Sequence, residues 1–99
     1  MIWQVRYTTA ARDDLLRLYG FPLEQDLDAA QRALDAIEKG IDLLRSFPFT
    51  CRKADPDNPF LRELLVSFGA SGYMALYEIG SNHTLTILAV RHQREDDYR

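Results

Sequence analysis

Cysteine is nearly absent from this sequence of 99 residues, because only Cys51 occurs. A single cysteine cannot form a disulfide within the chain, and this usage is typical of a reducing compartment. No apolar run approaches the ~20 residues that a membrane-spanning helix needs. The first residues also lack the basic and long apolar regions of a signal peptide. We therefore expect a cytoplasmic protein that does not associate with membranes.

Positive charge is also in short supply. Twelve Lys and Arg residues are outnumbered by fifteen Asp and Glu residues, so the net charge is −3 and the isoelectric point is near 5.2. Strong non-specific binding to nucleic acid needs about 6–10 phosphate contacts from cations. A broad phosphate-binding surface is therefore excluded, although a small local site is not. The composition, 46% apolar and 27% charged, is that of one globular domain over residues 1–99.

Motifs for cofactors and metals are missing as well. The chain has no glycine-rich phosphate loop, no CxxC pair and no HExxH, and neither His83 nor His92 has a cysteine nearby. We predict no metal site and no cofactor. Cys51 precedes Arg52 and Lys53, which would favour a reactive thiolate. The simpler interpretation is a small apolar residue in a loop.

Polar and apolar residues alternate over residues 2–8, which predicts a half-buried strand. The Thr8-Thr9 pair then offers an N-cap hydroxyl for a first helix. Asp13 and Asp14 fall early in that helix, where the helix dipole favours anions. We expect the helix to end at the Gly-Phe-Pro sequence of residues 20–22.

A second, longer helix is predicted next, with Asp26 or Asp28 as its cap and Pro48 as its end. Gly40 lies inside it and predicts a close approach between the two helices. Six residues at helical spacing form its apolar stripe: Ala30, Ala33, Leu34, Ile37, Ile41 and Leu44.

The second half of the chain is typical of strands. Residues 49–59 read as a proline-punctuated loop, and strands are predicted over residues 60–68, 73–79 and 84–90. A turn is expected within residues 67–72 and a short hairpin connection at 80–83. The order β-α-α-β-β-β indicates an α+β fold with a helical hairpin packed on one face of a mostly antiparallel sheet.

Two groups of polar side chains are candidates for chemistry. Arg62 lies in a segment otherwise fit for burial, so its guanidinium needs an acidic partner on an edge strand, or a cleft to face. Arg91, His92, Arg94 and Tyr98 bring guanidinium, imidazole and phenol groups close in sequence, which suits acid–base chemistry on a phosphodiester. The alternative is a solvated, charged terminus, because residues 95–97 are all acidic.

Five landmarks in this order resemble the RelE/ParE superfamily of toxins from bacterial type II toxin–antitoxin pairs. They are YTTAARDDL (7–15), IDLLRSFP (41–48), LREL (61–64), GYMALY (72–77) and ILAVRHQRE (87–95). The resemblance covers nearly the whole chain and implies the same β-α-α-β-β-β order. It also implies a cognate antitoxin as partner, in a hetero-oligomer.

Within this superfamily, the closing His-x-Arg stretch is more similar to the ParE branch than to the RelE branch. ParE toxins poison DNA gyrase, and no catalytic residues are agreed for them, so none is carried over to this sequence. The low isoelectric point, Glu78 and the lack of lysine in the last strand also favour this branch. The resemblance then implies target contacts from Arg62, Arg91, His92 and Arg94. Antitoxin contacts are expected at Trp3, Tyr7, Tyr19 and Phe21.

The alternative is the RelE-like branch, which cleaves messenger RNA on the ribosome. A resemblance of this sequence to that branch implies a catalytic set of Arg62, His92, Arg94 and Tyr98, with the ribosome and messenger RNA as partners. A third hypothesis is a degenerate homologue that binds only the antitoxin.

Overall fold

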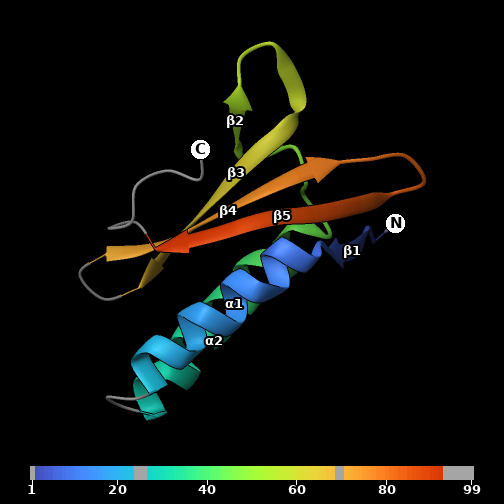
Figure 1. The fold of residues 1–99 in the computed structure, drawn as a ribbon. Helices are drawn as coiled ribbons and strands as arrows, with labels where there is room; N and C mark the ends of the chain where they lie inside the picture. The colour runs from blue at the N-terminus through green and yellow to red at the C-terminus, as the bar shows by residue number, and fades with distance from the viewer. Residues whose placement is uncertain (1, 24–26, 69–70, 93–99) are drawn as a thin grey trace.

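A helical hairpin covers one face of a five-stranded sheet in the computed structural model, which describes residues 2–23, 27–68 and 71–92 (Figure 1). This arrangement confirms the predicted α+β class. The elements follow in the order β1 (Gln4–Tyr7), α1 (Thr9–Leu23), α2 (Leu27–Leu44), β2 (Arg52–Asp55), β3 (Asn58–Phe68), β4 (Ser71–Ile79) and β5 (Thr84–His92).

The sheet has the strand order β1-β5-β4-β3-β2, and only β1 and β5 are parallel. β2 is one strand more than predicted, because residues 49–59 are not simply a loop. This strand is polar and lies at the sheet edge, so it has no apolar alternation to reveal it. It forms by pairing with β3, with Arg52 opposite Glu63 and Lys53 opposite Arg62.

α1 begins as predicted but ends later. The Ala11 backbone N–H donates to Thr8 Oγ1 at 3.0 Å, which confirms Thr8 as the N-cap. The helix continues through Gly20, Phe21 and Pro22 to Leu23, so the predicted stop was wrong. Proline removes a single helical hydrogen bond, and here it does so within the last turn.

α2 buries four residues of its predicted stripe in the core, namely Ala33, Ile37, Ile41 and Leu44, while Leu34 of the same stripe is half-buried. Ala30 and Asp26 lie outside the described side chains. Asp28 is in the first turn and pairs with Arg32 at 3.2 Å, so it is not the cap.

Gly40 allows a close approach, but to the sheet and not to α1 as predicted. A Cβ at this position would lie 3.0 Å from Val66 Cγ2 and 3.2 Å from Leu64 Cδ2. Both neighbours belong to β3, on which α2 packs. The glycine therefore sets the spacing between helix and strand.

β4 and β5 form the predicted hairpin, and Asn82 and His83 in its connection have positive φ angles of 56° and 55°. The register shifts once, because Leu76 pairs with Ala89 whereas Tyr77 pairs with Ile87. Leu88 is thus an extra residue, a β-bulge. The predicted turn at 67–72 includes residues 69–70, which lie outside the described ranges.

Candidate functional site

Arg62 on β3 is held by backbone carbonyls, and none of the ion pairs found among the described residues includes it, contrary to the predicted edge-strand salt bridge. Its Nε donates to Pro59 O at 2.6 Å, and its Nη1 donates to Phe49 O at 3.3 Å and to Cys51 O at 2.8 Å. The guanidinium carbon also lies 5.4 Å from the centre of the Phe49 ring. The neighbouring Glu63 binds Arg52 across the β2–β3 pair. Arg62 therefore fastens the segment before β2 to the sheet.

Tyr77 stands opposite Arg62 and anchors the same segment from within the core. Its hydroxyl donates to Pro48 O at 2.6 Å, and the residue is fully buried. Burial, followed by a hydrogen bond with the Cys51 side chain, raises the pKa of Tyr77 well above its usual range. Cys51 is half-buried and packs against the core, which fits the simpler of its two interpretations.

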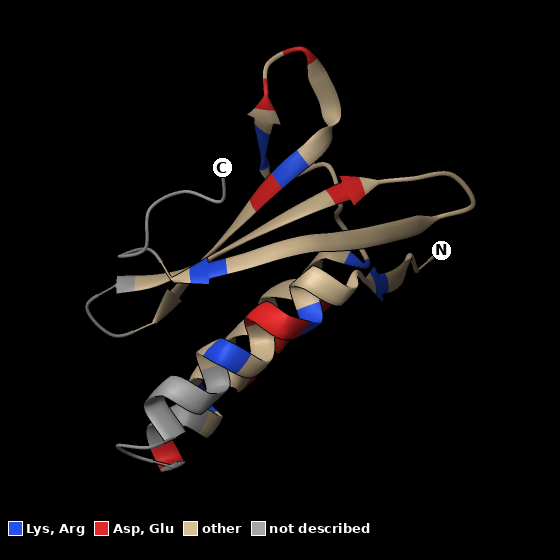
Figure 2. Cartoon of the chain, viewed as in Figure 1, with Lys and Arg blue, Asp and Glu red and all other residues tan. Residues whose placement is uncertain are grey.

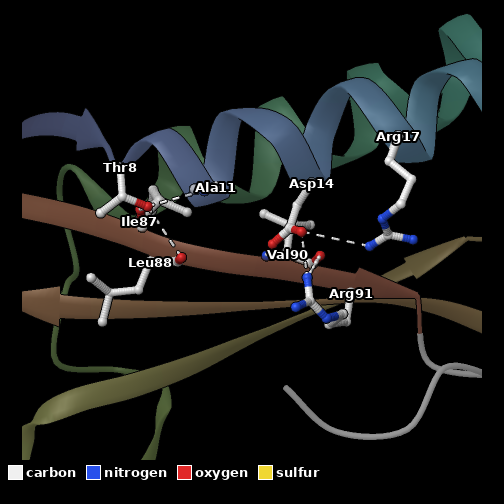
Figure 3. A network of polar contacts seen from close by, with 8 residues as sticks. All are labelled: Thr8, Ala11, Asp14, Arg17, Ile87, Leu88, Val90 and Arg91. Carbon is white, nitrogen blue, oxygen red and sulfur yellow. Dashed lines mark hydrogen bonds and ion pairs between the residues drawn. The ribbon is translucent and has the colours of Figure 1, made fainter. Parts of the chain in front are cut away.

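Asp14 joins α1 to the end of β5, as Figure 3 shows. One carboxylate oxygen accepts the Val90 backbone N–H at 2.9 Å, and the other lies 2.5 Å from Arg91 Nη1 and 3.7 Å from Arg17 Nη2. Only 9% of Asp14 is exposed. The predicted interaction with the helix dipole therefore missed its main role, and no sequence pattern links residue 14 to residue 90.

Of the residues proposed for acid–base chemistry, the structure describes Arg62 and His92, and these two lie apart. Arg62 pairs with Tyr77, and His92 pairs with Tyr73, four residues away along β4. Arg62 and His92 are therefore about 13 Å apart along the strand direction. Because β4 lies between β3 and β5, they are also two strand spacings, about 10 Å, apart across the sheet. His92 instead packs its ring against Tyr73 at 5.2 Å, while Arg91 binds Asp14. Figure 2 shows the basic end of β5 well apart from the basic segment of β3. Arg94 and Tyr98 lie outside the described residues.

A groove runs between β1 and α2, and Tyr7 is central to it. Its larger part, about 490 Å³, is lined by Gln4, Val5, Arg6, Tyr7, Glu38, Ile41, Asp42 and Arg45. A second part of about 260 Å³ shares Tyr7, Glu38 and Ile41. Burial, with a smaller effect from the Glu38 charge, raises the pKa of Tyr7, so its phenol is neutral at physiological pH. The edge of β1 that faces away from β5 has no strand partner among the described residues.

Trp3, another expected antitoxin contact, is not among the described residues that line this groove. Trp3 exchanges two hydrogen bonds with Arg45, from its backbone N–H to Arg45 O at 2.8 Å and from Arg45 Nε to its carbonyl oxygen at 3.2 Å. The side chains of Tyr19 and Phe21 are outside the described part of the chain.

Neither a metal cluster nor a membrane span is found in the part of the chain that the structure describes. No three His, Cys, Asp or Glu side chains there are placed to hold an ion. None of the described helices is long and apolar enough to cross a bilayer.

Comparison with known proteins gives consistent matches. Residues 5–97 match the family described as the ParE toxin of the type II toxin–antitoxin system parDE. Toxin RelE3 of Caulobacter vibrioides is 34% identical over 85 residues, covering 86% of this chain and 88% of that protein.

Two solved structures share the fold. The chromosomal ParDE toxin–antitoxin system from P. aeruginosa gives a TM-score of 0.69 at 15% identity, covering 92% of this chain and 96% of that one. The RelBE2 toxin–antitoxin complex from Mycobacterium tuberculosis gives a TM-score of 0.60 at 25% identity, covering 94% of this chain and 100% of that one.

Proposed function

This chain belongs to the ParE toxin family of type II toxin–antitoxin systems, and from that membership we propose that its target is DNA gyrase. On this proposal the toxin acts in the cytoplasm by binding gyrase and trapping it on cleaved DNA. A cognate antitoxin holds the toxin inactive.

The separation of Arg62 from His92 is the observation that carries the proposal. An acid–base catalyst has to come within hydrogen-bond reach of the atoms that react, about 2.6–3.2 Å. Arg62 is engaged by three carbonyl oxygens at one end of the sheet, and His92 packs on Tyr73 at the other. Trapping a complex requires binding surfaces and not a converging set of proton donors, so this layout supports a poison better than a nuclease.

Charge supports the same choice. The net charge of −3 leaves few cations for gripping ribosomal RNA. A protein target does not require a broad basic surface.

We infer that the antitoxin binds along the β1–α2 groove. The open edge of β1 offers unpaired backbone groups to an extended segment. Tyr7 and Ile41 offer apolar area to a segment that folds on binding. Co-expression with an adjoining antitoxin gene should give a stable complex, and Tyr7→Ala should weaken it.

The test of the target uses purified protein and two assays. We expect inhibition of ATP-dependent supercoiling by gyrase and accumulation of cleaved plasmid DNA. Neutral substitutions of Arg91, His92 and Arg94 should reduce inhibition in steps, because each removes one contact. Messenger RNA cleavage on ribosomes, with supercoiling unaffected, would overturn the proposal.

A RelE-like ribonuclease is the second candidate, and the 34% identity to Toxin RelE3 favours it. On this candidate Tyr98 or His92 supplies a proton and Arg62 stabilises phosphate charge. Removal of the proton donor should then reduce cleavage by about 10²–10⁴-fold while folding is intact.

A further inference from the structure

Four aromatic side chains that are distant in sequence form a continuous row at one end of the sheet. The Trp3 ring lies 4.9 Å from the His83 ring and 6.5 Å from the Phe49 ring, and Phe49 lies 6.3 Å from Phe60. We call these four residues the aromatic row. It joins the start of β1, the β4–β5 connection, the segment before β2 and the start of β3.

The aromatic row is open to solvent. Phe49 is 49% exposed and Phe60 is 51% exposed, while His83 is exposed and Trp3 half-buried. Clustered exposed apolar side chains of this kind are typical of interaction sites, whereas single ones are ordinary. Aromatic residues and arginine also dominate the binding energy of protein interfaces.

Positive charge lies beside the aromatic row. The Arg62 guanidinium lies over the Phe49 ring, and its hydrogen bonds go to carbonyl oxygens, which do not neutralise its charge. Arg52 and Lys53 follow on β2, and Figure 2 shows these basic residues on adjacent strands. Glu63 compensates Arg52. Arg62 and Lys53 therefore place positive charge on the strands beside the aromatic row, while Asp55, Asp57 and Glu78 are the acids near the same end of the sheet.

We propose that the aromatic row is the docking surface for the toxin's protein target, through a target segment that combines an apolar side chain with a carboxylate. This inference rests on the proposed function, under which the target is gyrase. The apolar side chain covers the exposed rings of Phe49 and Phe60, and the carboxylate lies near Arg62. Charge complementarity of this kind steers association and fixes the register of binding.

The observations favour the target over the two other occupants. None of the four residues of the aromatic row is among the described residues that line the β1–α2 groove assigned to the antitoxin, and only Trp3 adjoins that groove, through its hydrogen bonds with Arg45. Strong binding of a nucleic acid strand needs about 6–10 phosphate contacts, and β2 and β3 offer only the cations of Arg52, Lys53 and Arg62. The rings also meet edge to face, at 79° and 70°, which uses part of their stacking faces.

The test measures how much full-length toxin is needed to inhibit gyrase supercoiling. Phe60→Ala should raise that concentration by about tenfold or more, while Phe60→Tyr, which keeps the ring, should stay within about threefold of wild type. Phe60→Asp should be at least about tenfold worse than Phe60→Lys, because only the aspartate repels an acidic target. A structural role for Phe60 predicts the opposite order, because a negative charge two residues from Arg62 on the same face of β3 is more favourable for the fold than a positive one.

Leu16→Ala is the matched control, because Leu16 is a 71% exposed apolar residue on α1 outside the aromatic row. Thermal unfolding of every variant identifies any that misfold, and Phe49→Ala gives an independent second site. If wild-type toxin inhibits gyrase but Phe60→Ala behaves like Leu16→Ala, or if the Asp and Lys variants are equal, the docking surface is wrong. If wild-type toxin does not inhibit gyrase, the proposed function itself is rejected, and this docking partner with it.

Two further measurements identify a different occupant. Loss of antitoxin co-purification by Phe60→Ala, with gyrase inhibition retained, would assign the aromatic row to the antitoxin. Binding of wild-type toxin to a labelled single-stranded oligonucleotide that Phe60→Ala abolishes, with gyrase inhibition retained, would assign it to nucleic acid. Either result would overturn the proposal.

Discussion

Replacing Asp14 with alanine should destabilise the fold more than any exposed charge substitution. The Asp14 carboxylate accepts a hydrogen bond from the Val90 backbone N–H and binds the Arg91 guanidinium. The alanine substitution removes both interactions at once. Leaving a buried donor unsatisfied costs about 1–3 kcal/mol, and removing one member of a buried ion pair costs about 3–5 kcal/mol. The two costs are not simply additive, because the same carboxylate serves both groups. Because Arg91 is 27% exposed and recovers some hydration, we expect a loss of about 3 kcal/mol.

Asp14→Asn separates the two contributions. The amide oxygen still accepts the Val90 N–H, so only the ionic part is lost and the expected change is about 1–2 kcal/mol. Urea unfolding, followed by circular dichroism, should show lower midpoints at an unchanged slope. Asp13→Ala is the control, because Asp13 is exposed in the same turn of α1, and it should change stability by less than about 0.5 kcal/mol. Equal midpoints for Asp13→Ala and Asp14→Ala would refute the proposed link between α1 and β5.

Two other predictions concern the core. Ile37 is only 3% exposed, so Ile37→Ala should lower the free energy of unfolding of the protein by about 2–5 kcal/mol. An unchanged urea midpoint would mean that α2 packs through another face. Alkaline pH should also destabilise the protein. The pKa of Tyr77 is raised by folding, so above about pH 10 the unfolded chain loses its proton first and stability falls by up to about 1.4 kcal/mol per pH unit. Tyr77→Phe should make that decline shallower, and an identical pH profile would contradict the assignment.

The sequence predicts elements well where apolar periodicity is strong, and poorly where tertiary contacts decide. The stripe of α2 and the strands β3 to β5 follow from periods of 3.6 and 2 residues. β2 carries no such period, since its stability comes from pairing with β3. Proline at position 22 signals a helix end only to within a turn. Local sequence rules thus predict the elements whose residues repeat with a clear period, and they fail for an edge strand and for the exact end of a helix.

The candidate site is harder to derive because its contacts are long-range. Arg62 seemed to need an acid, yet three carbonyls of a segment brought close by folding satisfy it. Asp14 reaches Val90 across 76 residues of sequence. The Phe49 ring contacts both Trp3 and Phe60 only because the sheet brings the starts of β1 and β3 to the same end of the molecule. No spacing rule in the sequence encodes these encounters.

The parallel pairing of β1 with β5 has a consequence for the time at which the toxin matures. Gln4 pairs with Thr84 and Tyr7 with Ile87, so the first strand has no partner until the last strand has been synthesised. Contacts between residues this far apart form late, because a long loop must close before they stabilise the chain. The helical hairpin and the β3–β4 hairpin, by contrast, are local and can form earlier. The groove assigned to the antitoxin includes β1, and it is therefore completed among the last parts of the molecule. An antitoxin that recognises this groove distinguishes a finished toxin from a nascent chain.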